Sequence, residues 1–161
     1  MLIREGQQAP NFTLPASDNS VFTLYDRLSE KTVILSFYPK NHLFACPSKK
    51  IFEQSKSLVD AYPQVKSLGA ELYGISVDNL DSHKKFISEF GIPFLLLSDE
   101  KKEVIKIYAD QNIFGLAKRS LVIIDRDRKI FKIIKDMDPY KAGDDLLSVL
   151  NNLSNQSSKL K

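Results

Sequence analysis

One short apolar segment constrains the fold of this chain more than any other. Residues 32–38 read Thr-Val-Ile-Leu-Ser-Phe-Tyr, a β-rich run with polar or charged neighbours, which predicts a strand buried on both faces. Pro39 follows directly and is expected to end the strand, because proline has no N–H to donate to a sheet. A strand covered on both sides needs packing layers above and below it, which favours an α/β structure.

The rest of the chain alternates predicted helices with predicted strands. Helical spacing of apolar residues predicts helices over residues 47–58, resuming at 65–68 after an interruption at Pro63, and over 81–90, 103–109 and 143–150. Further strands are predicted over 70–77, 94–97, 120–124 and 129–134, the last two as an antiparallel hairpin. The pattern predicts a central mixed β-sheet with helices on both faces.

The length and charge of the chain limit the number of domains and the classes of partner that we expect. A chain of 161 residues is expected to form a single domain over residues 1–161, with the polar segment 151–161 as a frayed tail. The net charge of +3 is spread along the chain, so no nucleic-acid partner is predicted. No apolar run is long enough to span a membrane and the start does not resemble a signal peptide, so we expect a cytoplasmic location.

The chain contains one cysteine, Cys46, directly before the helix predicted from residue 47. A helix N-terminus carries partial positive charge, which lowers a thiol pKa and favours the nucleophilic thiolate. With only His42 and His83 beside it, no metal-ligand cluster is expected, and no cofactor is predicted. We expect His42 to be solvated and His83 to lie on a polar helix face. The alternative for Cys46 is a buried, unreactive side chain.

Several segments resemble peroxiredoxins, most closely the bacterioferritin-comigratory-protein or PrxQ subfamily of the AhpC/TSA-like proteins. They are residues 9–14, residues 37–40 with Cys46 seven positions after Pro39, and residues 76–86, 91–99 and 118–125. The resemblance covers nearly everything but the tail. It implies a thioredoxin fold and a thiol-dependent peroxidase with antioxidant activity.

The resemblance also implies roles for individual residues. Cys46 matches the peroxidatic cysteine, Pro39 the proline that begins the active-site loop, and Arg119 the arginine that stabilises the thiolate and polarises the peroxide. Residues 43–45, which are Leu43, Phe44 and Ala45, fall in the substrate-binding part of that loop. The implied partners are hydrogen peroxide or an alkyl hydroperoxide and an external thiol such as thioredoxin or glutathione, with the protein a monomer or a weak homodimer.

The active-site loop and the start of the helix predicted after it depart from the family pattern at three positions. Leu43 stands where the family has threonine, Lys49 where it has glutamate, and Ile51 where many relatives have a resolving cysteine. A dithiol-disulfide oxidoreductase is disfavoured because it needs a Cys-x-x-Cys pair. A catalytically degenerate peroxiredoxin scaffold that acts as a thiol redox sensor or a binding module stays open as the alternative to a one-cysteine peroxidase.

Overall fold

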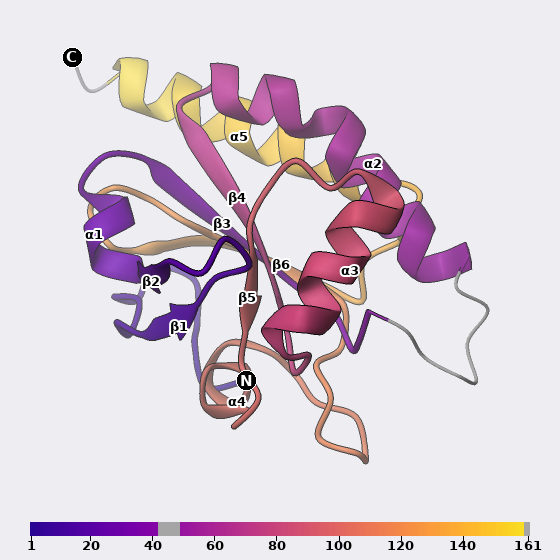
Figure 1. Ribbon diagram of the computed structural model, residues 1–161. Helices are drawn as coiled ribbons and strands as arrows, with labels where there is room; N and C mark the ends of the chain where they lie inside the picture. Colours follow the sequence, from indigo (N-terminus) through magenta and orange to yellow (C-terminus); the bar gives the residue numbers. More distant parts are fainter. Residues whose placement is uncertain (42–48, 160–161) are drawn as a thin grey trace.

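A five-stranded mixed sheet forms the centre of the computed structural model, which describes residues 1–41 and 49–159, with the backbone alone for 49–54 (Figure 1). The strand order is β5-β4-β3-β6-β7. The strands are β3 (Thr32–Phe37), β4 (Ala70–Ser76), β5 (Leu96–Ser98), β6 (Ser120–Ile124) and β7 (Ile130–Lys135). The β3-β4 and β4-β5 pairs are parallel, whereas β3-β6 and β6-β7 are antiparallel. The predicted mixed sheet and its terminal hairpin are therefore confirmed.

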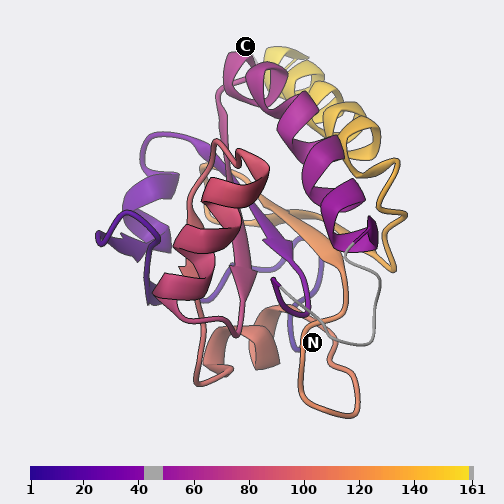
Figure 2. The same ribbon diagram turned by 45° about the vertical axis from the view of Figure 1, so that its right-hand side comes forward.

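Helices cover both faces of this sheet. One face carries α2 (Lys49–Ser67), α3 (Leu80–Phe90) and α5 (Ala142–Lys159), whose buried side chains share one core cluster. The other face carries α1 (Leu24–Leu28), α4 (Glu103–Tyr108) and a small antiparallel pair, β1 (Thr13–Pro15) with β2 (Val21–Thr23). Figure 2 shows α2 and α5 side by side on their face of the sheet.

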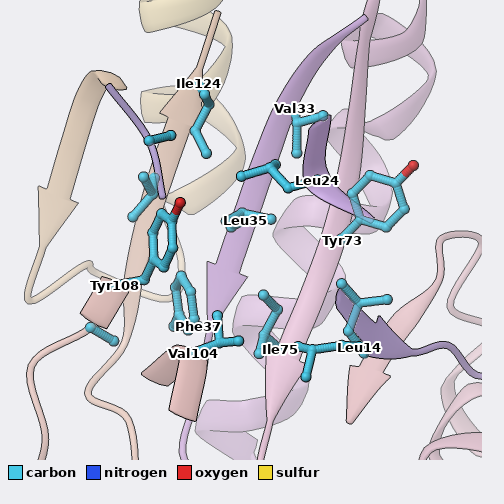
Figure 3. Packing of buried hydrophobic residues seen from close by; sticks show 14 of the residues in the cluster. Leu14, Leu24, Val33, Leu35, Phe37, Tyr73, Ile75, Val104, Tyr108 and Ile124 are labelled. Atoms are coloured by element: carbon cyan, nitrogen blue, oxygen red, sulfur yellow. The ribbon is translucent and has the colours of Figure 1, made fainter. Parts of the chain in front are cut away.

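Strand β3 is buried on both faces, as the sequence predicts. Its side chains alternate between the two cores, because successive strand residues point to opposite faces of a sheet. Val33, Leu35 and Phe37 join the core under α1 and α4, whereas Ile34 joins the core under α2 and α5. Figure 3 shows Leu35 and Phe37 beside Tyr108 of α4 in the first of these cores.

The structure corrects the predicted course of two helices. Helix α2 runs through Pro63 without interruption, because Leu58, Tyr62 and Val65 hold it against the sheet on both sides of the proline. Helix α5 does not end near residue 150 but continues to Lys159, so the polar segment 151–159 is helical. Its first turns are fixed by buried leucines, and the last two turns extend them with exposed polar residues.

The N-terminal elements were not predicted. Strands β1 and β2 contain three residues each, and α1 contains five, so none is long enough to show a hydrophobic period. The predicted strand over residues 94–97 lies slightly later, as β5. Among the described residues no helix is long and apolar enough to cross a membrane.

Candidate active site

The end of β3 and the start of β6 lie together at one edge of the sheet. Their antiparallel register pairs Phe37 with Ser120, so the residues just after Phe37 and just before Ser120 are neighbours. Arg119 directly precedes Ser120, and Pro39 is the second residue after Phe37, so both lie at this edge of the sheet. The edge is also the carboxyl end of the parallel strands β4 and β5, where loops of an α/β sheet gather around ligands.

A surface hollow of about 540 Å³ opens at this edge, and both Pro39 and Arg119 line it. The guanidinium of Arg119 is largely enclosed, because its Nε and Nη2 atoms are shielded from solvent while the residue as a whole is half-buried. Two acidic residues, Asp136 and Asp138, line the same hollow. A permanently charged group held in a partly desolvated hollow can stabilise negative charge that develops beside it.

The structure therefore brings together two of the predicted site residues, Pro39 and Arg119. Cys46, the substrate-binding candidates Leu43, Phe44 and Ala45, and His42 lie outside the described residues. The expected helix start at residue 47 also lies outside them, and the described part of α2 begins at Lys49. Across residues 1–41 and 49–159, no cluster of three or more His, Cys, Asp or Glu side chains is placed to hold a metal ion.

A buried polar network begins at Asn41, two residues after Pro39 and the last described residue before the segment that contains Cys46. Asn41 is 2% exposed. Its backbone N–H donates to Asp78 Oδ2 at 2.8 Å, and its side-chain oxygen accepts from the Tyr38 hydroxyl at 2.8 Å. Its Nδ2 lies 3.0 Å from Ser82 Oγ and 3.1 Å from His83 Nδ1. One asparagine thus joins the end of β3 to the start of α3.

Asp78 is the second centre of this network. Oδ2 accepts from Ser76 Oγ at 2.6 Å as well as from the Asn41 amide, and Oδ1 accepts from Ser82 Oγ at 3.1 Å. Ser98 on β5 donates to the Asp78 carbonyl. The Asp78 carboxylate therefore connects the chain after β3 and the end of β4 with the first turn of α3, and its backbone carbonyl adds the end of β5.

His83 is fully buried, so its expected place on a polar helix face is wrong. Its Nε2 lies 3.1 Å from the carbonyl oxygen of Leu97, which only accepts, so Nε2 carries the proton. In a neutral ring Nδ1 is then an acceptor, which matches the Nδ2 donor of Asn41. Burial lowers the pKa of His83 from its ordinary value of 6.5, although Asp78 and the Leu97 hydrogen bond act in the opposite direction.

This lowered pKa predicts a pH dependence of stability. The unfolded chain takes up a proton at His83 near pH 6.5, before the folded protein does, so the free energy of unfolding should fall as the pH drops below 6.5 towards the lowered pKa. Urea unfolding between about pH 7.5 and about pH 5 would measure this slope. The His83→Gln variant, which cannot titrate, is the control. An equal slope in both proteins would contradict the assignment.

Sequence reasoning found neither Asn41 nor Asp78. Residues 76–86 contribute to the family resemblance, but the sequence does not show that Asp78 accepts a hydrogen bond from Asn41. The two residues come together only because β3 pairs with β4. The sequence also gives no sign that the Tyr38 hydroxyl donates to Asn41. Burial raises the pKa of Tyr38, so the hydroxyl stays protonated and donates to Asn41.

Comparison with known proteins agrees with this architecture. Residues 5–133 match the AhpC/TSA family. The chain therefore belongs to the AhpC/TSA family, whose peroxiredoxins are thiol peroxidases that reduce a peroxide at the expense of a thiol. Within the family its relatives place it in the bacterioferritin-comigratory-protein or PrxQ subfamily.

Two curated relatives illustrate the match. Chloroplastic peroxiredoxin Q of Populus jackii is 32% identical over 154 residues, which cover 94% of this chain and 70% of the relative. The putative peroxiredoxin bcp of Coxiella burnetii is 36% identical over 118 residues, covering 71% of this chain and 74% of the relative.

Solved structures show the same thioredoxin-type peroxiredoxin fold. PrxQ of Xylella fastidiosa superposes with a TM-score of 0.84 at 20% identity, covering 96% of this chain and 99% of that chain. Thioredoxin peroxidase I of Plasmodium yoelii superposes with a TM-score of 0.82 at 26% identity, covering 96% of this chain and 93% of that chain. The predicted fold class is thereby confirmed.

Proposed function

We propose that this protein is a one-cysteine, PrxQ-like peroxidase that reduces hydrogen peroxide or alkyl hydroperoxides. The observation that carries the proposal is the pairing of Pro39 and Arg119 in one hollow, where the chain enters the segment that contains Cys46. A partly enclosed guanidinium at this place favours a nearby thiolate and also a peroxide oxygen that gains negative charge.

The proposed reaction uses the thiolate of Cys46 as the nucleophile. Its sulfur attacks one oxygen of the peroxide, the O–O bond breaks, and the departing oxygen leaves as water or an alcohol once protonated. The product is a sulfenic acid at Cys46. Because the 161 residues contain one cysteine, an external thiol must condense with this sulfenic acid, releasing water, and a second thiol must then release Cys46 from the mixed disulfide.

The reductant in this proposal is a small thiol or dithiol protein of the glutathione or thioredoxin type. Both kinds of thiol are kept reduced in the cytoplasm, where we propose that the protein acts as a monomer or weak homodimer. Single turnover with peroxide followed by addition of each reductant in turn would identify the partner, because only the true reductant restores the free thiol rapidly.

Stopped-flow oxidation of the pre-reduced protein by hydrogen peroxide and by an alkyl hydroperoxide tests the proposal. We expect a second-order rate constant far above that of a free thiol of the same pKa. Mass spectrometry after one equivalent of peroxide should show one added oxygen at Cys46. A rate equal to that of a free thiol would refute the peroxidase proposal.

Two residues near Cys46 favour a second candidate, a degenerate scaffold that acts as a thiol sensor or binding module. Leu43 lacks the hydroxyl that the family resemblance places in the peroxide network, and Lys49 reverses the charge of the usual glutamate. Such a scaffold would exchange its thiol with partner thiols or disulfides without fast peroxide reduction. The same stopped-flow experiment separates the two candidates.

If the missing hydroxyl limits the reaction, Leu43→Thr should accelerate it. One added hydrogen bond to a group that carries charge in the transition state is expected to raise the peroxide rate constant about tenfold. Leu43→Val is the matched control, since valine has the shape of threonine without the hydroxyl. Equal rate constants for the threonine and valine variants would show that the hydroxyl does not contribute.

A further inference from the structure

We propose that Asn41 is a positioning residue of the peroxidase site, held in place by Asp78 and by the neutral ring of His83. The inference rests on the proposed function, because the role assigned to Asn41 is to position the segment that leads to Cys46. It assigns a role to a buried polar network that the proposed reaction does not otherwise use.

Asn41 lies close in the chain to both the hollow and the segment with Cys46. Pro39 lines the hollow beside Arg119, and Asn41 lies two residues further on, where the described chain stops before the segment with Cys46. Any shift of Asn41 therefore changes where this segment starts relative to Arg119. Displacements of about 1 Å at a reacting centre can cost about a hundredfold in rate.

Asn41 is held from several directions. Tyr38, Asp78, Ser82 and His83 each lie within hydrogen-bond distance of its polar atoms. The ring of Tyr38 also stacks on Phe86 of α3, with 6.3 Å between ring centroids. A buried polar network with its partners satisfied fixes one arrangement, because any other arrangement leaves desolvated polar groups unpaired.

The charge state of His83 affects the contact with Asn41. The titratable groups that face its ring are the Asp78 carboxylate and the Tyr38 hydroxyl, whose oxygen lies 3.4 Å from Nδ1. Protonation at Nδ1 would place an N–H against the Nδ2 donor of Asn41, so that hydrogen bond is lost in the observed arrangement. The anchor at Asn41 should therefore weaken in acid.

The test compares two asparagine variants. Asn41→Ala removes the anchor, whereas Asn79→Ala removes only the N-cap of α3, where Asn79 Oδ1 accepts from the Ser82 backbone N–H at 2.9 Å. Both substitutions remove a hydrogen bond to the first turn of α3, so the two variants are matched for the loss of stability that this causes. For each protein we would measure the peroxide rate constant of Cys46 and its alkylation by iodoacetamide across pH.

Iodoacetamide reports the reactivity and pKa of the thiol without needing an oriented peroxide. We expect Asn41→Ala to lower the ratio of peroxide rate to alkylation rate about tenfold, and Asn79→Ala to leave it within about twofold of the wild type. A wild-type ratio equal to that of free cysteine would refute the proposed function itself. The Cys46 pKa would then still decide the role of Asn41. If Asn41 positions the thiol, Asn41→Ala should shift this pKa more than Asn79→Ala does.

The Asn41→Asp variant tests the contact with His83. A carboxylate at this place accepts only, so Nδ1 must become a donor, and the pKa of His83 measured by NMR should rise by about one unit or more. The pH at which the ratio of peroxide rate to alkylation rate falls in acid should rise together with this pKa. Two results would overturn the proposal: an unchanged His83 titration in Asn41→Asp, or equal ratios and thiol pKa values in Asn41→Ala and Asn79→Ala.

Discussion

The Cys46→Ser variant is expected to lose peroxide reduction altogether. A serine hydroxyl stays protonated at neutral pH and cannot carry the oxygen as a sulfenic acid, and the chain has no second cysteine to replace it. Peroxide consumption in the presence of a thiol reductant should fall to the rate of the reductant alone. Mass spectrometry should show no oxidised cysteine product.

A relocated thiol provides the control for this variant. Cys46→Ser combined with Ser67→Cys keeps one thiol in the chain but moves it to the exposed last residue of α2. We expect this double variant to react with peroxide as slowly as a free thiol of its pKa. If it matches the wild type, position contributes nothing and the active-site proposal is refuted.

The Arg119→Met variant should show the second-largest effect. Methionine has a similar length but no charge and no N–H donors, so both the thiolate and the transition-state oxygen lose their cationic neighbour. Removal of one preorganised donor of this kind lowers the rate about a hundredfold to about a thousandfold. The pKa of the Cys46 thiol should rise at the same time, which alkylation across pH would measure.

Two further variants separate charge from geometry at this position. Arg119→Lys keeps the charge but loses the planar fork of donors, so its rate constant should lie between those of the wild type and Arg119→Met. Lys129→Met removes one positive charge from the exposed β6-β7 turn at the opposite edge of the sheet and should leave the rate unchanged. An Arg119→Met rate within about twofold of wild type would refute the proposed role.

The sequence predicted the sheet better than the layers that cover it. The buried runs of β3, β4 and β6 are continuous enough to be recognised as strands without any structural context. The N-terminal strands are too short for that, and α5 continues beyond its apolar positions because an established helix extends more easily than it begins. The predicted interruption at Pro63 does not occur, because packing against other parts of the chain holds α2 together.

The candidate site was predictable only in part for the same reason. Pro39 and Arg119 are found by family resemblance, and the β3-β6 register then brings them together. His83 sits among charged neighbours in the sequence, which suggests an exposed helix face. Its ring is held by Asn41 and by the Leu97 carbonyl, which belong to distant segments and leave no local pattern in the sequence.

The antiparallel pairing of β3 with β6 also has a consequence for the order of events during synthesis. Pro39 and the Cys46 segment leave the ribosome long before Arg119, and β4 and β5 are made in between. Contacts between such distant segments form late in folding, because closing the intervening chain costs entropy. If Arg119 activates Cys46 as proposed, a nascent chain carries its thiol without the arginine, and we expect full reactivity only when β6 adds to the sheet.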